Sequence, residues 1–294
     1  MYILNTESGE VNRPFTRNFL KKFYFLPSNL ANIVDILPDE PEHILMSLPA
    51  RTAQFEQNRV TFNSSVVYKV DITNKTNRVI QAGLKGIYNW QTDRQHNVRI
   101  GTSFKDGIVT THVKNIDSGA WQALWPYKVF SEDEVNVKGF GQDPNELYIS
   151  AYHNKRKAIF KVNLADPKLI RKLVYAHDFY DVDSDLLYSK TAKKVIGLSS
   201  NDGGMVFFEA DLRSIKKTID KSLAKTANYI YSIADDMQSY IVFSTGDTES
   251  GIYYLGQRNP TKLSAIKYRY NNLPPKDLVK VQEYSYKARD GLTI

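Results

Sequence analysis

Two neighbouring segments, GQDPNELYISAY (141–152) and FKVNLADPKLIRKL (160–173), contain the pattern from which the fold can be predicted. The first begins with a polar turn and continues as ELYISAY (146–152), a run rich in apolar and aromatic residues that is typical of a strand. The second resembles a hairpin, because a turn centred near Asp166 separates two strand-like runs. Together the two segments predict consecutive antiparallel strands joined by short turns.

The hairpin recurs along the chain. After a longer first interval, its turns are spaced by about 43, 48, 45 and 48 residues, with the turn-like Asp211 supplying the one missing position. The recurring hairpins are YILNTESGEVNRPF (2–15), YKVDITNKTNRVI (68–80), HVKNIDSGAWQAL (112–124), FKVNLADPKLIRKL (160–173) and YYLGQRNPTKLSAI (253–266).

The polar turn that precedes a strand recurs in step with the hairpin. Two features that repeat in register are harder to obtain by chance than one. The turn-and-strand segments are LPDEPEHILMSL (37–48), QTDRQHNVRIGTS (91–103), GQDPNELYISAY (141–152), SKTAKKVIGLSS (189–200) and ADDMQSYIVFST (234–245).

A period near 45 residues with about four strands per repeat predicts an all-β protein of the β-propeller class. We expect about five complete blades between residues 21 and 270, and a partial blade at residues 2–15. Because closing a ring usually takes about six to eight blades, we expect the first blade or blades to be missing. The predicted propeller domain spans residues 1–276, and residues 277–294 are predicted to be its last strand and a linker.

One segment departs from the strand pattern. Within DLRSIKKTIDKSL (211–223), apolar residues recur at helical spacing, and Asp211 is a candidate N-cap. We therefore expect one short helix inserted in a blade, with an apolar stripe packed on the blade edge. The residues of that stripe are Leu212, Ile215, Ile219 and Leu223.

Composition excludes several classes of protein. The 294 residues are 42% hydrophobic and 24% charged, which excludes collagen-like and largely disordered chains. The sequence contains no apolar run of about 18 residues and no secretory signal pattern at its start. It has no cysteine, which excludes disulfides, Cys-ligated zinc, iron–sulfur clusters and thiol nucleophiles. Either the periplasm or the cytoplasm of a bacterium is compatible with this composition.

The net charge of +7 raises the question of a nucleic-acid partner. The basic residues are interleaved with acidic ones and fall where hairpin turns are predicted, so we interpret them as solvated surface and expect no nucleic-acid partner. The densest groups are Lys155, Arg156, Lys157 and Lys161, then Lys168, Arg171 and Lys172, then Lys193 and Lys194.

Two serines come near the Gly-x-Ser-x-Gly pattern of serine hydrolases. They lie in Gly101-Thr102-Ser103-Phe104-Lys105 and Gly197-Leu198-Ser199-Ser200-Asn201. Both segments lack the second glycine and lie in strand patterns, whereas the nucleophile elbow requires a strand-to-helix turn. We therefore predict no catalytic residue in this chain.

Metal and cofactor sites are also not predicted. No phosphate-binding or dinucleotide fingerprint is present. No pair at ligand spacing occurs among the five histidines, which are His43, His96, His112, His153 and His177. Asp181, Asp183 and Asp185 have the spacing of the start of a calcium loop but lack its glycine and distal glutamate, so we interpret them as turn residues. Asp235 and Asp236 receive the same interpretation.

The segment VQEYSYKARDGLTI (281–294) is the most specific in the chain. It resembles the junction in prolyl-oligopeptidase-family serine peptidases, where a β-propeller runs into an α/β-hydrolase domain. The likeness extends to VKGFGQDPNELYISAY (137–152), KAIFKVNL (157–164) and YIYSIADDMQSYIVFSTGDTESGIYYLG (229–256), and is nearest to acylaminoacyl- and dipeptidyl-peptidase-like members. The matching residues at the junction are Tyr286, Ala288, Arg289, Asp290, Gly291, Leu292 and Ile294.

The resemblance implies a function. The propeller would cap the active site of a serine peptidase and admit only short peptides, and Ala288, Arg289, Asp290 and Gly291 would form the interdomain linker. Its partner would be the hydrolase domain of the same polypeptide, which holds the catalytic triad and is absent from these 294 residues. The chain alone would be non-catalytic, with no cofactor and no membrane partner. The paired glutamates by which dipeptidyl peptidases hold an amino terminus are not found.

Two other classes stay open from the sequence. A free-standing propeller could act as a protein-interaction scaffold, and a propeller associated with nucleic acid is suggested by charge alone. A steep salt dependence of DNA or RNA binding would identify the latter.

Overall fold

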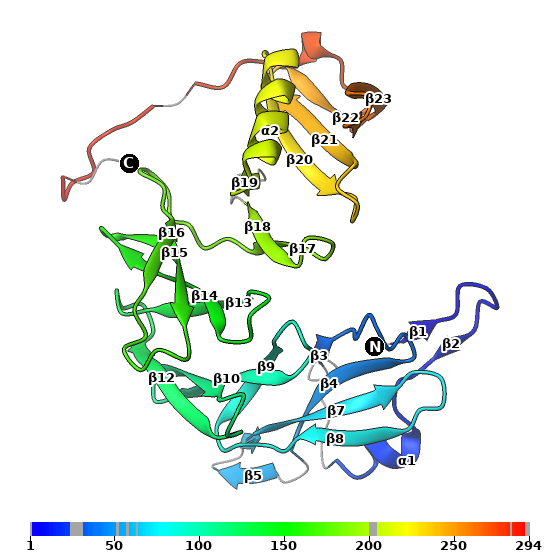
Figure 1. Ribbon diagram of the computed structural model, residues 1–294, viewed down its shortest axis with the longest axis vertical. Coiled ribbons are helices and arrows are strands. Elements are labelled where there is room, and N and C mark those ends of the chain that lie inside the picture. Colours follow the sequence, from blue (N-terminus) through cyan, green and yellow to red (C-terminus); the bar gives the residue numbers. More distant parts are fainter. Residues whose placement is uncertain are drawn as a thin grey trace. The chain divides into compact units, whose positions relative to one another are not determined.

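The computed structural model describes residues 2–23, 32–50, 53–56, 59–62, 64–199, 205–282 and 284–291. The chain divides into two compact units, Met1–Asp183 and Ser184–Ile294, and each is described by itself (Figure 1). Of the described residues, only α1 (Arg17–Leu20), α2 (Ala210–Ser222) and the 3₁₀ turn η1 (Pro275–Asp277) are helical. None of these helices is long and apolar enough to cross a membrane.

The first unit contains three four-stranded antiparallel sheets, each of which follows the chain order. The strands of these sheets are β3 (Asn32–Asp35), β4 (His43–Pro49), β7 (Ser65–Asp71) and β8 (Asn77–Gln81); β9 (Ile87–Thr92), β10 (Val98–Lys105), β11 (Ile108–Lys114) and β12 (Trp121–Lys128); and β13 (Val135–Phe140), β14 (Glu146–His153), β15 (Arg156–Asn163) and β16 (Lys172–Tyr175). Two small hairpins accompany them, β1 (Ile3–Leu4) with β2 (Val11–Asn12) and β5 (Ala53–Glu56) with β6 (Arg59–Phe62).

The second unit contains one three-stranded and one four-stranded antiparallel sheet. The three-stranded sheet consists of β17 (Leu186–Ser189), β18 (Lys194–Ser199) and β19 (Met205–Phe207). After α2, the last sheet consists of β20 (Ala227–Ile233), β21 (Ser239–Gly246), β22 (Glu249–Gln257) and β23 (Lys262–Tyr268). Five successive meander sheets confirm the predicted all-β class and the blade pattern of a propeller.

Both repeating landmarks of the sequence have structural counterparts. The polar turn joins the first and second strands of each of the five sheets, as between β13 and β14. The hairpin joins the third and fourth strands, as between β15 and β16. The first interval is longer because α1 precedes the first sheet and the β5–β6 hairpin is inserted between β4 and β7.

The prediction of a hairpin turn at Asp211 is wrong. The chain leaves β19 at Phe207 and enters α2 at Ala210, so this sheet has no fourth strand among the described residues. The helix itself was predicted correctly, but its N-cap is Glu209, and Asp211 lies in its first turn. At this position the negative charge of Asp211 interacts favourably with the positive end of the helix dipole. The Asp211 carboxylate also forms an ion pair with Arg258 at 3.0 Å.

The helix forms because its apolar stripe covers one face of the neighbouring strands. Leu212 and Ile219 are 2% and 3% exposed, and they pack with Ile196, Ile230 and Val242. Partly buried Ile215 and Leu223 complete the stripe that helical spacing predicted.

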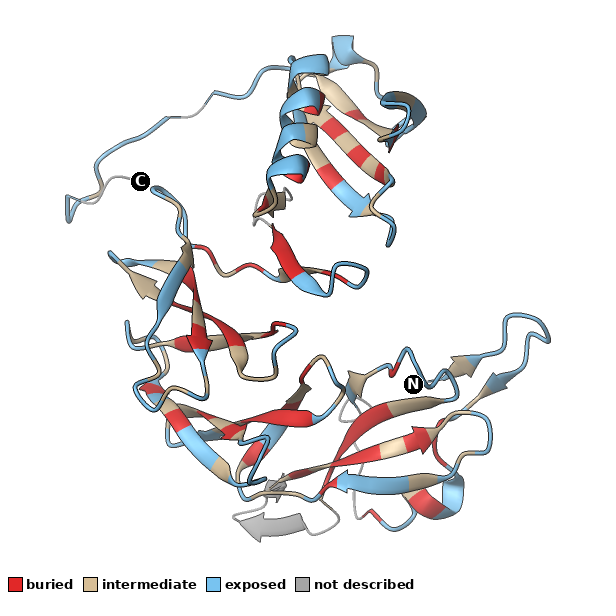
Figure 2. Cartoon of the chain, in the orientation of Figure 1, coloured by how far each residue is buried: buried red, intermediate tan, exposed pale blue. Residues whose placement is uncertain are grey.

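The middle strands of a sheet are buried on both faces, which explains their continuous apolar runs (Figure 2). In β4, Leu45 packs toward the second sheet with Ile87 and Val98, whereas Met46 and Leu48 pack on the other face. On that other face they meet Phe15 and Phe19, so the α1 region covers it. Packing of one sheet face on the next sheet, as at Leu45, is the arrangement expected of successive blades.

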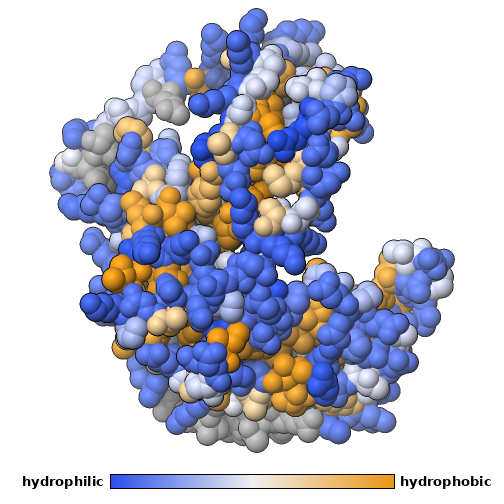
Figure 3. All heavy atoms as spheres, in the orientation of Figure 1, coloured by the Kyte–Doolittle hydropathy of each residue, from blue (hydrophilic) through white to orange (hydrophobic). Residues whose placement is uncertain are grey.

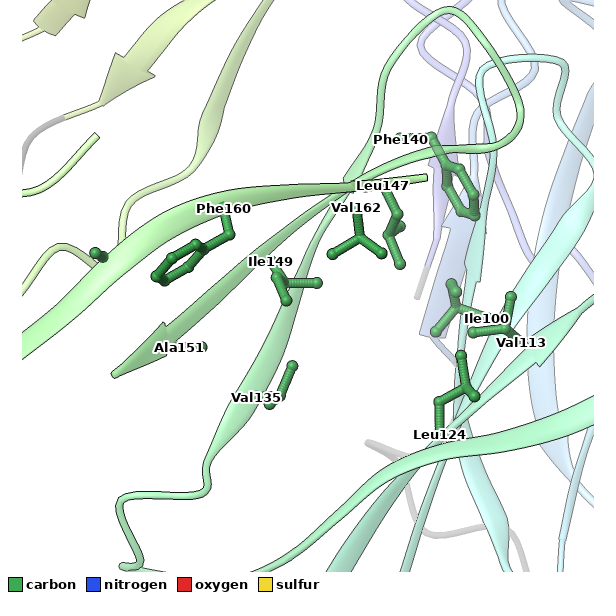
Figure 4. Close-up of a cluster of buried hydrophobic side chains, with 11 residues drawn as sticks. Ile100, Val113, Leu124, Val135, Phe140, Leu147, Ile149, Ala151, Phe160 and Val162 are labelled. Carbon is green, nitrogen blue, oxygen red and sulfur yellow. The ribbon is translucent and has the colours of Figure 1, made fainter. Parts of the chain in front are cut away.

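The second and third sheets share the largest apolar cluster of the first unit (Figure 4). Leu147 and Val162 of the third sheet point toward Ile100, Val113 and Leu124 of the second. Leu147, Val162 and Ile100 are each fully buried, so this cluster holds the two sheets together through dispersion and the hydrophobic effect.

Candidate functional site

A half-buried group of charged side chains lies at the start of the third sheet. We call Glu134, Lys138, Lys157 and Asp183 the charged cluster. Lys138 lies at an irregularity of β13, where the pairing with β14 shifts between Val137 and Gly139. Lys157 is the second residue of β15.

Ion pairs join the four side chains of the charged cluster. Lys138 Nζ lies 2.7 Å from Asp183 Oδ1, and Lys157 Nζ lies 2.9 Å from Glu134 Oε1 and 3.6 Å from Asp183 Oδ2. Asn136 donates to Glu134 Oε1 at 2.7 Å and accepts from the Tyr127 hydroxyl at 3.2 Å. Tyr127 belongs to β12, so the network also reaches the second sheet.

Electrostatics favour the charged forms of Asp183 and Lys157. Burial opposes ionisation of Asp183, but the hydrogen bond from Lys138 and the charges of both lysines outweigh it and lower its pKa. Burial likewise opposes the charge of Lys157, yet the hydrogen bond to Glu134 and the nearby carboxylates raise its pKa. The cluster is therefore a set of compensated ion pairs.

The charged cluster fastens the segment that follows the third sheet. Asp181 accepts a hydrogen bond from the backbone N–H of Lys157 at 3.0 Å, and the backbone N–H of Val182 donates to the carbonyl of Lys157 at 2.8 Å. The carboxylates are the more exposed partners, at 22% and 34% of the side chain against 13% and 16% for the lysines. The carboxylate side of the cluster therefore lies nearer to solvent than the lysine side.

Sequence reasoning missed this cluster. It treated Asp181 and Asp183 as turn residues, whereas Asp183 forms ion pairs with lysines that are distant in the sequence. No local spacing signals such pairs, because antiparallel meanders bring their members together. Within the described ranges, no group of three or more His, Asp or Glu side chains could hold a metal ion.

The structure brings together two candidate residues that were considered separately. Ser103 Oγ lies 2.8 Å from His112 Nε2 on the adjacent strand β11, and burial lowers the pKa of His112. Ser103 lies within β10, far from any strand-to-helix turn of the kind that exposes a nucleophile. Ser199 Oγ instead bonds the backbone of Asp185, and Ser200 falls outside the described residues.

The basic groups of the sequence fall only partly in turns. Lys155 lies in the β14–β15 turn and Lys193 in the β17–β18 turn, and both are exposed. The prediction that the groups fall in turns is wrong for five members, which lie in strands: Arg156, Lys157, Lys161, Lys172 and Lys194. Hydrophilic residues predominate on the face drawn in Figure 3, where hydrophobic ones form small separate groups. The absence of a nucleic-acid partner stays a prediction.

The proposed linker forms a tight turn. The backbone N–H of Gly291 donates to the carbonyl of Ala288 at 2.9 Å, and Gly291 has a φ of 85°, which favours glycine. Arg289 and Asp290 at the turn are exposed. Leu292 and Ile294, which also match the junction pattern, lie outside the described residues.

Solved structures with a similar fold were found. A prolyl endopeptidase, from a study of inter-domain dynamics in two such enzymes, matches 99% of this chain with a TM-score of 0.53 and 12% identity. The chain shares its fold with prolyl oligopeptidases. Prolyl oligopeptidase B from Galerina marginata, bound to a 35-residue hydrolysis and macrocyclization substrate, matches 99% of the chain with a TM-score of 0.50 and 13% identity.

The match to prolyl oligopeptidases covers only part of those enzymes. The chain spans 41% of each of these two prolyl oligopeptidase chains. The acylaminoacyl peptidase of Pyrococcus horikoshii also matches, at 11% identity and a TM-score of 0.43, over 90% of this chain and 41% of that one. No family model matches the chain, and no curated protein matches it in sequence.

Proposed function

We propose that this chain is the substrate-gating, size-selecting propeller part of a serine peptidase that cleaves short peptides. The observation that supports it is the run of five successive meander sheets, which shares its fold with prolyl oligopeptidases over 99% of the chain. The junction-like segment ending in Ala288-Arg289-Asp290-Gly291 supports the same proposal.

Gating would be a steric property of the sheets. Sheets that bury both faces resist deformation, because closely packed interiors transmit strain instead of yielding. A rigid wall of this kind excludes folded chains and admits extended ones. The partly exposed carboxylate of Glu134 would offer an acceptor to a backbone N–H group of a passing peptide.

The catalytic partner would be an α/β-hydrolase domain of the same polypeptide. We propose that residues 1–276 form the propeller domain and that residues 277–294 lead into this partner, with Ala288, Arg289, Asp290 and Gly291 as the linker. The tight turn closed by Gly291 suits such a role, since it fixes the direction of the chain at the boundary.

Size selection is tested on the complete natural polypeptide. One cleavable sequence is presented as a free short peptide and within a loop of a folded protein. We expect cleavage of the free peptide only. Equal cleavage of both substrates would contradict gating. If a serine-directed probe labels the polypeptide but neither substrate is cleaved, the proposed short-peptide substrate is contradicted.

A further inference from the structure

A cavity of about 190 Å³ lies within the second unit, between the three-stranded sheet and the turn that joins β20 to β21. Its apolar walls come from Leu186, Ile196, Met205, Ile233 and Met237. The volume is several times that of a water molecule, so small solutes can enter.

The cavity exposes the sulfur-containing side chains of this unit. Of the methionines that the structure describes, Met46 is fully buried, whereas Met205 and Met237 are partly exposed and line the cavity. The chain has no cysteine, so an oxidant finds no thiol to react with first.

The position of the Met237 sulfur is fixed from two sides. The buried Ser189 hydroxyl donates to Met237 Sδ at 3.6 Å. The backbone of Met237 is held by hydrogen bonds from its own N–H to Ala234 and from Arg258 to its carbonyl. The sulfur therefore stays at the cavity wall between two sheets.

We propose that Met205 and Met237 form a peroxide-sensitive modification site that controls the packing between the last two sheets. The sulfur attacks one oxygen of a hydroperoxide, the O–O bond breaks, an S–O bond forms, and the second oxygen leaves as water or an alcohol. Sulfur loses two electrons and the peroxide gains them. A reductase acting on methionine sulfoxide restores the thioether.

The consequence follows from the packing of the two side chains. Both contact the apolar cluster that contains Ile196, Ile230 and Val242. A sulfoxide oxygen is polar and needs a donor, and placing it among apolar neighbours weakens their association. A sheet junction of the first unit provides a comparison. There Asp35 binds Thr92 and His96, and none of these three side chains contains a sulfur atom that peroxide could oxidise.

The test uses hydrogen peroxide on the full chain, with peptide mass mapping over time. We expect Met205 and Met237 to gain an oxygen at least about tenfold faster than Met46, which serves as the internal control. Amide exchange should then rise in β17 and β20 and stay unchanged in β10 and β14. Treatment with a methionine sulfoxide reductase should reverse the rise.

Two leucine variants separate this effect from general damage. The double variant Met205→Leu, Met237→Leu should show no rise in exchange after peroxide, whereas Met46→Leu should respond as the natural chain does. Oxidation of Met46 at the same rate as Met237, or unchanged exchange after both sulfurs are oxidised, would overturn the proposal. Reductase reversal on the natural chain needs no variant, so the proposal stays testable if a variant fails to fold.

Discussion

The guanidinium of Arg99 in the second sheet lies 5.2 Å from the ring centroid of Phe140 in the third. Arg99 is 2% exposed and also binds Asp93, whose side chain is fully buried, at 3.3 Å. A cation on the face of an aromatic ring adds to the apolar packing of these two sheets. The buried Asp93–Arg99 ion pair therefore positions a cation that contributes to the junction alongside the apolar cluster.

Replacing Asp93 should destabilise the first unit strongly. Asp93→Ala leaves Arg99 buried without its counter-charge and removes the acceptor for the backbone N–H groups of Gln95 and Asn97. We expect a loss of about 3–5 kcal/mol in the free energy of unfolding. Urea denaturation followed by tryptophan fluorescence measures it, because Trp90, Trp121 and Trp125 all lie in the first unit.

The exposed pair Lys105–Asp106 is the control for Asp93. Its side chains are 87% and 83% exposed and 4.0 Å apart, so loss of this ion pair should leave the transition unchanged. The control variant is Asp106→Asn, because Asp106 has a φ of 52° and asparagine tolerates that backbone conformation. Similar losses for the two variants would show that burial does not decide the effect.

The stability of the first unit should fall on acidification through Asp35. Burial opposes its ionisation, but hydrogen bonds from Thr92, His96 and the Leu37 N–H outweigh it and lower its pKa below 3.8. A lowered folded pKa stabilises the fold above the unfolded pKa, and this contribution is lost as pH falls through the folded value.

Asp35→Asn isolates that contribution. The variant should be less stable than the natural chain at neutral pH, and the difference should shrink from about pH 5 downward and vanish below the lowered pKa of Asp35. Denaturation curves at a series of pH values measure this. A difference that stays constant with pH would contradict the assignment.

The aromatic cover of the first sheet should contribute to stability. Phe19 of α1 stacks on Phe15 at 5.1 Å and meets Tyr68 edge-on at 5.4 Å. Phe19→Ala should cost about 3–5 kcal/mol of unfolding free energy by leaving a cavity. Phe130→Ala, at a fully exposed position, is the matched control and should cost nothing measurable.

The charged cluster should protect the segment that follows β16 in the first unit from proteolysis. Asp183→Asn removes the ionised partner of Lys138 and Lys157, and the exposed Phe179 and Tyr180 lie in the segment that this partner fastens. We expect faster chymotrypsin cleavage there, measured by mass spectrometry. The exposed Asp39→Asn serves as control, and equal rates in both variants would refute the role of the cluster.

The sheets could be predicted from the sequence because their signal is periodic. The turn before ELYISAY and the hairpin around Asp166 mark the first-to-second and third-to-fourth strand connections, and both repeat. The helix was also predictable, since Leu212 and Ile219 fall on one face.

The long-range side-chain contacts could not be predicted. Asp35 meets His96 in the next sheet, Ser103 meets His112 on the neighbouring strand, and Lys138 meets Asp183 in the segment after β16. No local spacing in the sequence brings these partners together. The error at Asp211 has a related cause. A turn-like residue after a strand is compatible with a hairpin or with the first turn of a helix, and the burial of Leu212 in tertiary contacts selects the helix.

Peptide hydrolysis, measured side by side for residues 1–294 and for the complete natural polypeptide, tests the central claim most directly. We predict that the 294-residue chain leaves a short peptide anilide intact, and that the complete polypeptide cleaves it until a serine-directed inhibitor is added. Cleavage by the 294-residue chain that the same inhibitor abolishes, or a complete polypeptide without peptidase activity, would contradict the claim.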